Sequence, residues 1–255
     1  MTTRITYTAL PGLPLVSPGD DLVEMIVAGA GRADVKVADG DIFVLAQKIV
    51  SKSENRYVDL ADVTPSERAR ELAMTVGKDP RHIEVVLSES KDVLRTRQNV
   101  IIVEHRLGFV MANAGIDESN IAHGDGEARV LLLPVDPDAS CARLKEGLDR
   151  AFGCEVGVLM NDSFGRPWRN GVVGVAVGSA GIPSLYNMIG APDLFDRAMQ
   201  VTEVAIADEL AAAASLVMGQ GDEGQPVVHI SGFNSKATVN PVATLVRPKE
   251  KDMFR

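Results

Sequence analysis

Apolar and polar residues follow one another along the chain in patterns that predict short strands and helices. Residues 4–10, "RITYTAL", alternate and are rich in β-branched residues, as is typical of a strand. A loop with three prolines follows, and residues 20–31 show a helical pattern that ends at a glycine. The apolar run within Gly40–Glu54 predicts a buried strand that turns polar at Gln47 and Lys48.

Helix start and stop signals predict three helices farther along the chain. Thr64 stands where an N-cap is expected, with proline next and Glu67 completing a capping box. Asp79, again followed by proline, repeats the start signal. A third helix is predicted with Asp138 as its cap and Gly153 as its stop.

The remaining segments predict more strands and one long helix. The helix is expected from about Pro192 to Met218, and one strand is expected to end at Asp162. This order of hairpins and helices favours an α+β or mixed α/β fold over a regular βαβ series. No repeat or flexible linker interrupts residues 1–255, which predicts a single folding unit. Strands are predicted over residues 99–115, as a pair around a turn near 105–107, and over 128–134, 155–162, 171–181, 225–231 and 242–247.

Composition limits the classes of partner. The net charge of −9 argues against nonspecific binding to nucleic acid or to anionic membranes. The first residues lack the continuous apolar region of a signal peptide, and no run reaches the roughly 18 apolar residues needed to span a bilayer. We therefore expect a cytoplasmic protein. In that compartment Cys141 and Cys154 are expected as free thiols.

The common nucleotide-binding and hydrolase motifs are absent. The chain has no P-loop, no G-x-S-x-G elbow and no H-E-x-x-H pair. Residues 219–224, "GQGDEG", match G-x-G-x-x-G, but they follow a predicted helix and precede a predicted strand. A dinucleotide fingerprint has the opposite order, so we do not expect a Rossmann site. A glycine-rich turn can nevertheless hold phosphate with its backbone N–H groups.

Four segments place polar residues at or just after a predicted buried element. Ligand sites often lie on such loops, held by a rigid scaffold. The oxygens of Asp117, Asp162, Ser163 and Gln220 suit Mg²⁺ or Mn²⁺ bound together with phosphates. The polar residues are Lys48, Ser51 and Lys52 in the first segment, Asn113, Asp117 and Asn120 in the second, Asp162, Ser163, Arg166 and Arg169 in the third, and Gln220, Asp222 and Glu223 in the fourth.

Each of these residues also has a structural interpretation. The Asp117 side chain could form a hydrogen bond with the backbone of its own turn, and Asp162 could cap the end of a strand in the same way. Lys48 and Lys52 could form a solvated edge, and Trp168 is more typical of packing than of stacking on a base. The residues alone therefore indicate a metal and oxyanion site and no particular reaction.

Six segments, in order, resemble one family, the coenzyme F420-0:L-glutamate ligases. The resemblance implies GTP-dependent addition of L-glutamate to F420-0 through an acyl phosphate, with γ-linked extension of the tail. It also implies two Mg²⁺ or Mn²⁺ sites, a stimulating K⁺, and a family-specific, two-lobed mixed α/β fold in an intertwined homodimer. No counterpart of the nitroreductase-like extension of some relatives is recognised. The segments are "LPGLPLV", "GDIFVLAQKIVSKSE", "GFVMANAGIDESN", "LLLPVDPDAS", "NDSFGRPWRNGVVGVAVGSAG" and "MGQGDEGQPVV".

The resemblance also assigns roles to residues. It implies that Asp117 and Asp162 bind the first metal and that Ser163 and Gln220 bind the second. Ser163 stands where threonine is frequent and Gln220 where some members have glutamate, and the neutral amide weakens the expected second site. The residues implied to contact the nucleotide are Leu13, Pro14, Leu15, Val16, Gln47, Lys48, Lys52 and Asn120, together with the glycine-rich turn of Gly219 and Gly221.

Catalysis would then rest on Asp117, Asp162 and Lys52, without an enzyme nucleophile. We hypothesise that Arg166 and Arg169 neutralise the developing charge or bind the phosphodiester of F420-0. Two alternatives remain open: a metal-dependent nucleotide phosphohydrolase, and a nucleotide-binding protein without activity. Release of phosphate that depends on glutamate separates the ligase from the hydrolase.

Overall fold

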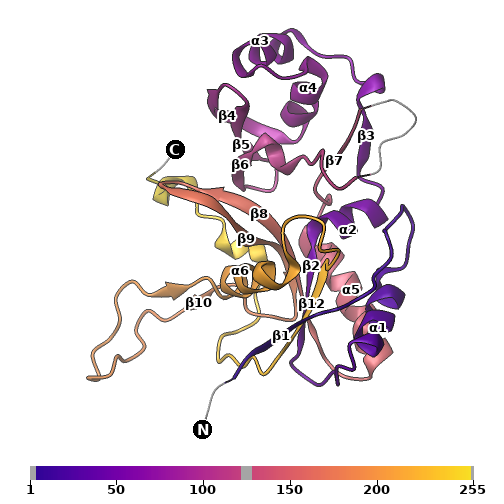
Figure 1. Ribbon diagram of the computed structural model, residues 1–255. Coiled ribbons are helices and arrows are strands. Elements are labelled where there is room, and N and C mark those ends of the chain that lie inside the picture. The colour runs from indigo at the N-terminus through magenta and orange to yellow at the C-terminus, as the bar shows by residue number, and fades with distance from the viewer. Residues whose placement is uncertain (1–3, 122–127, 254–255) are drawn as a thin grey trace.

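The computed structural model describes residues 4–121 and 128–253, which form the predicted mixed α/β fold (Figure 1). Five strands make the main sheet: β1 (Thr6–Ala9), β2 (Ile42–Ala46), β8 (Gly157–Arg166), β9 (Arg169–Ala180) and β12 (Val227–Ser231). Their order is β1-β12-β2-β8-β9. Only β2 and β8 pair in parallel, and the other neighbours are antiparallel.

Helices cover both faces of this sheet because its central strands are apolar on both sides. Helices α1 (Leu22–Arg32) and α5 (Pro137–Phe152) pack on the face that carries Phe43 and Leu45. Helix α6 (Ile206–Met218) packs on the opposite face. Figure 1 shows α1 and α5 on one side of the sheet and α6 on the other. We call this part of the chain the sheet body.

Residues 57–121 and 128–132 form a smaller unit with a hydrophobic core of its own, drawn above the sheet body in Figure 1. Helix α2 (Gln47–Ser53) leads from the sheet body toward this small unit. The unit contains a two-stranded and a three-stranded sheet. Its elements are β3 (Tyr57–Asp59), η1 (Leu60–Asp62), α3 (Glu67–Val76), α4 (Pro80–Ser88), β4 (Ser90–Arg97), β5 (Val100–His105), β6 (Val110–Ala112), η2 (Asn113–Gly115) and β7 (Arg129–Leu131).

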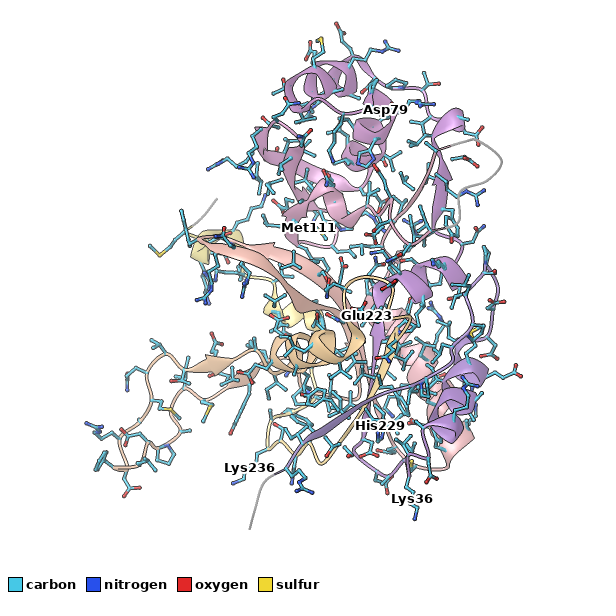
Figure 2. All side chains as sticks on the ribbon, viewed as in Figure 1. Lys36, Asp79, Met111, Glu223, His229 and Lys236 are labelled. Atoms are coloured by element: carbon cyan, nitrogen blue, oxygen red, sulfur yellow. The ribbon has the colours of Figure 1, made fainter. Side chains whose placement is uncertain are left out.

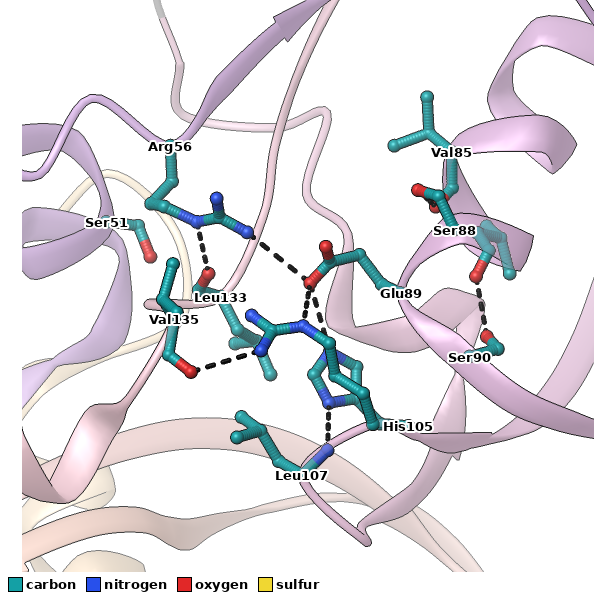
Figure 3. A network of polar contacts seen from close by, with 12 residues as sticks. Ser51, Arg56, Val85, Ser88, Glu89, Ser90, His105, Leu107, Leu133 and Val135 are labelled. Carbon is teal, nitrogen blue, oxygen red and sulfur yellow. Dashed lines mark hydrogen bonds and ion pairs between the residues drawn. The ribbon is translucent and has the colours of Figure 1, made fainter.

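A carboxylate network fastens the small unit to the sheet body (Figure 3). Glu89 contacts Arg106 at 2.8 Å, Arg56 at 3.4 Å and His105 at 3.6 Å. The two guanidinium groups also donate to the backbone carbonyls of Leu133 and Val135. Burial raises the pKa of Glu89, but the hydrogen bonds from His105 and Arg106 and the charges of Arg106 and Arg56 outweigh it and hold the pKa at about 2.

Several predicted boundaries were wrong for local reasons. The polar half of Gly40–Glu54 is helix α2, not strand. Ser66, rather than Thr64, is the N-cap of α3, and its hydroxyl accepts from the Ala69 N–H group. The cap of α5 is Asp136. Asp138 instead accepts the backbone N–H of Ser179 and of Val242, so it holds neighbouring segments together.

Two longer predictions failed over part of their length. The helix expected from Pro192 begins only at Ile206, and residues 187–205 form a projecting arm. The strand expected to end at Asp162 continues to Arg166 as one half of a long hairpin. The last predicted strand is a 3₁₀ turn, η3, after Pro241. The remaining elements are β10 (Tyr186–Asn187), β11 (Glu203–Val204), η3 (Val242–Leu245) and η4 (Lys249–Lys251).

Other predictions were confirmed. Cys141 and Cys154 are both free thiols. The "GQGDEG" turn follows helix α6 and precedes strand β12, the order that argued against a Rossmann site. In the described part of the chain, no helix is long and apolar enough to cross a membrane.

The Glu89 network predicts a loss of stability in acid. The folded-state pKa lies near 2, below the ordinary value of 4.5, so Glu89 stabilises the fold above pH 4.5 and loses that effect as the pH falls toward 2. Glu89→Gln should lower the unfolding free energy at pH 7 by about 3 kcal/mol, and the difference should shrink below pH 4.5. Urea unfolding across this pH range measures it.

Glu71→Gln, an exposed change on α3, provides the control because it removes the same charge outside any such network. It should leave stability within about 0.5 kcal/mol of the wild type. A Glu89→Gln protein as stable as this control at pH 7 would show that the network does not hold the small unit in place.

Candidate active site

The sheet topology brings four distant segments to one edge of the sheet. In the parallel pair of β2 and β8, Ala46 lies opposite Asn161, so the start of α2 lies beside Asp162. Strand β12 begins at this edge, since Val227 pairs with Leu45, and the glycine-rich turn precedes it. Leu10, at the end of β1, donates its N–H to Val227 O, which starts the proline-containing loop at the same edge.

Asp117 reaches this edge from the small unit. Its carboxylate accepts a hydrogen bond from Gln47 Nε2 at 2.5 Å and forms an ion pair with Lys48 Nζ at 2.7 Å. The other end of the Gln47 amide accepts from Ser51 Oγ, one helical turn later, which fixes its orientation. Burial raises the pKa of Asp117, and the charge and hydrogen bond of Lys48 oppose this. Asp117, Gln47 and Lys48 are therefore brought together, as expected.

Asn120 and Lys52 make a second link between the small unit and the sheet body. Lys52 Nζ donates to Asn120 O at 2.7 Å, and Asn120 Nδ2 donates to Gly221 O at 3.3 Å. Burial and the neighbouring charge of Lys48 lower the pKa of Lys52, while Asp117 raises it. Two lysines and one carboxylate thus lie beside the glycine-rich turn.

Asp162 has few compensating contacts at this edge. One of its oxygens accepts the N–H of the next residue, Ser163, at 2.8 Å. Burial raises the pKa of Asp162 to about 7, and the negative charge of Asp117 adds to the rise, whereas Lys48 counteracts it. A cation bound at this point would relieve the repulsion between the two carboxylates.

Ser163 and Gln220 lie together, as their predicted common role requires. Ser163 Oγ donates to Gln220 Oε1 at 2.8 Å, and Gln220 Nε2 donates to Ser215 Oγ at 2.9 Å. Ser215, near the end of α6, therefore orients the Gln220 amide so that its oxygen faces the hairpin. The sequence places Ser51 among the polar residues of the first segment but indicates no role for it, and it does not single out Ser215, because both act through contacts that depend on where the helices lie.

The loop that contains Leu13–Val16 begins at this edge, directly after Leu10. Val16 is buried in the core beneath α1, whereas Leu15 is 91% exposed. Farther along the loop, Gly19 donates its N–H to Ser53 O at the end of α2. The loop is thus anchored on both sides of a short exposed apolar stretch.

Arg166 and Arg169 lie at the tip of the β8–β9 hairpin. Arg166 is four residues beyond Asp162, about 13 Å along an extended strand. Its guanidinium donates to Asn170 O, within its own turn. Trp168 occupies the turn with φ of +64° and is 88% exposed. The structure therefore does not gather these arginines around Asp162 within one chain.

The donor set at the edge consists of oxygens and suits a hard cation. No group of three or more histidine, cysteine, aspartate and glutamate residues suited to a metal occurs in the described ranges. Two carboxylates, a hydroxyl and an amide oxygen instead match the sites at which Mg²⁺ is held by one or two carboxylates together with substrate phosphates. The two lysines can balance the phosphate charge.

Comparison with known proteins agrees with this geometry. The model of the F420-0:Gamma-glutamyl ligase family matches residues 12–232. Three similar proteins are each named coenzyme F420:L-glutamate ligase. The protein of Methanothermobacter thermautotrophicus is 45% identical and the alignment covers 98% of this chain and 99% of the relative. For Methanocaldococcus jannaschii the values are 43%, 95% and 94%, and for Archaeoglobus fulgidus 38%, 99% and 97%. The chain belongs to the F420-0:gamma-glutamyl ligase family.

Proposed function

We propose that this protein joins L-glutamate to coenzyme F420-0 through an amide bond, at the expense of GTP. The observation that carries the proposal is the gathering of Asp117, Lys48, Lys52 and Asp162 beside a glycine-rich turn. The names of the relatives support the substrates, and the alignments extend over almost the whole chain. Phosphoryl transfer needs positioning and charge neutralisation more than a nucleophilic side chain, which suits this set of residues.

The reaction has two balanced steps. In the first, a carboxylate oxygen of F420-0 attacks the γ-phosphorus of GTP, and the bond from that phosphorus to the β-phosphate oxygen breaks. GDP leaves, and the acyl phosphate of F420-0 remains for the second step. In the second, the amine of glutamate attacks the acyl carbon, inorganic phosphate leaves and the amine loses a proton. The γ-carboxylate of the added glutamate can re-enter the first step, which would extend the tail.

The residues contribute charge and orientation. Lys52 now donates to Asn120 O and would turn its ammonium toward the γ-phosphate as negative charge moves to the leaving oxygen. Lys48 holds Asp117 in place across the joint between the two units. Asp117 and Asp162 would hold one Mg²⁺ or Mn²⁺, and Ser163 with Gln220 a second. Bound there, the metals would neutralise phosphate charge, and K⁺ would add to the same effect.

We also propose that the protein is an intertwined homodimer held by the arm of residues 187–205. The arm projects from the sheet body (Figure 1) and exposes apolar side chains that a lone chain leaves in water. Leu194 is 98% exposed, Phe195 76% and Val201 84%. A second copy of the chain is the proposed partner for this surface.

The reaction itself is tested by omission. Purified protein with F420-0, L-glutamate, GTP, Mn²⁺ and K⁺ should yield a product heavier by one or more glutamyl residues, detected by mass spectrometry. Leaving out F420-0, glutamate, GTP or Mn²⁺ should abolish it, and ATP should not replace GTP. Cleavage of GTP at the same rate without glutamate would instead indicate a phosphohydrolase.

The carboxylate pair is tested by isosteric substitution. Asp117→Asn and Asp162→Asn should each lower kcat by about a thousandfold, since each removes a carboxylate proposed to hold the cation that neutralises the transferred phosphoryl group. Asp92→Asn is the matched control, because Asp92 also accepts the N–H of the next residue at 2.8 Å but lies on β4. Circular dichroism should show all three variants folded. Near-normal turnover in either site variant would remove that residue from the proposal.

The dimer is tested on the arm. The double substitution Leu194→Glu and Phe195→Glu should convert the protein to a monomer of 27.2 kDa, measured by light scattering after size exclusion. Gln200→Glu, on the same arm, adds a charge without removing apolar surface and should leave the dimer intact. A wild-type protein of 27.2 kDa at micromolar concentration would exclude the proposed dimer.

A further inference from the structure

The side chain of Glu223 folds back onto the turn that carries it. This turn, residues 219–224, joins α6 to β12, and Figure 2 labels Glu223 where the sheet body meets the small unit. Glu223 Oε2 accepts the backbone N–H of Gly221 at 2.8 Å. The backbone N–H groups of Glu223, Gly221 and Gln220 lower the pKa of the Glu223 carboxyl.

The carboxylate occupies a concave surface of the backbone that only glycine leaves open. A Cβ atom on Gly219 would lie 2.1 Å from the carboxyl carbon of Glu223. Gly219 has φ of +76° and ψ of −179°, a backbone conformation that is essentially confined to glycine. Successive N–H groups around such a concavity form a nest for an anion. The anion found in this nest belongs to the protein itself.

The rest of the turn is fixed, whereas the Glu223 side chain is exposed. Gln220 is held by Ser163 and Ser215, and Gly221 O accepts a hydrogen bond from Asn120. The nest is therefore preformed, and only the Glu223 side chain has to move for another anion to enter. A phosphate oxygen offers the same acceptors to N–H groups as a carboxylate oxygen does.

We propose that Glu223 occupies a phosphate-binding nest of backbone N–H groups and must leave it before a nucleotide phosphate binds there. The proposal rests on the GTP dependence proposed above and makes Glu223 a residue that sets nucleotide affinity. When the nest is occupied by Glu223 in most molecules, the apparent dissociation constant is the intrinsic constant divided by the fraction of molecules whose nest is free.

The test measures GTP binding without F420-0 or glutamate, by calorimetry with Mn²⁺ on the full chain. Glu223→Ala should bind GTP about tenfold more tightly, as expected if about nine molecules in ten have the nest occupied. Glu223→Gln, which keeps the shape but loses the charge, should fall between this variant and the wild type. Asp222→Ala is the matched control, since it removes the same charge from the same turn.

Three results would overturn the proposal. Weaker GTP binding by Glu223→Ala would mean that the Glu223 carboxylate stabilises the conformation of the turn that binds GTP. Unchanged binding would mean that the nest does not receive a phosphate. Equal tightening by Asp222→Ala would assign the effect to net charge.

A second readout keeps the proposal separate from the reaction. Inorganic phosphate is titrated while the amide signal of Gly221 is followed by nuclear magnetic resonance. Glu223→Ala should respond at about a tenth of the phosphate concentration that the wild type needs. If the wild type fails to bind GTP but this response is seen, the GTP-dependent function fails and the nest stands. If Gly221 does not respond in either protein, the nest proposal fails whatever the ligation assay shows.

Discussion

The parallel pairing of β2 with β8 is the constraint on which the site depends. It places the carboxyl ends of two strands at one edge, so that Lys48, just beyond β2, lies near Asp162 on β8. The antiparallel partner β12 must then begin at that same edge, which brings the glycine-rich turn into reach. Parallel strands need long connections, and here the connection between β2 and β8 includes the whole small unit. The same crossover that makes the pairing parallel therefore supplies Asp117 and Asn120.

The charged residues of the site come from both units, and Lys48 of the sheet body pairs with Asp117 of the small unit. Burial raises the pKa of both Asp162 and Asp117, and the negative charge of Asp117 raises the pKa of Asp162 further. Lys48 offsets this for Asp117 through a direct contact, whereas Asp162 has only a backbone N–H group and more distant charge. An arrangement that is unfavourable without a ligand is typical of a functional site, because a bound cation or substrate completes the balance. In the Glu89 network, which lies away from this edge, positive charges balance the carboxylate. This network holds the small unit against the sheet body.

Much of the fold could be predicted from periodicity, but the site could be predicted only in outline. Buried strands and capped helices such as α4 depend on local patterns, and these predictions were confirmed. The part of the arm from Pro192 to residue 205 was predicted as helix, yet its apolar residues Leu194, Phe195 and Val201 are exposed. Thr64 and Ser66 offer equivalent capping chemistry, and a tertiary contact decides between them, since Glu84 accepts from Ser66. The roles of Ser51 and Ser215 could not be predicted for the same reason: their contacts with Gln47 and Gln220 exist only once α2 and α6 are in place.

The four segments at the sheet edge also differ in how firmly they are held, and this bears on the order of events during binding. Gln47 is fixed by Ser51, and Gln220 by Ser215, so these amides are oriented before any ligand arrives. The side chains of Lys52 and Glu223 instead form hydrogen bonds with backbone groups. A phosphate could take the place of the Glu223 carboxylate and could accept a hydrogen bond from Lys52. This combination of rigid oxygen donors and two exchangeable charged side chains favours entry of metal and phosphate together. A phosphate alone would have to displace the Glu223 carboxylate while it is repelled by Asp117 and Asp162. In the proposed function, a cation held by Asp117 and Asp162 would remove the repulsion that the two carboxylates exert on a bare phosphate, and nucleotide binding at this edge would then be coupled to metal binding.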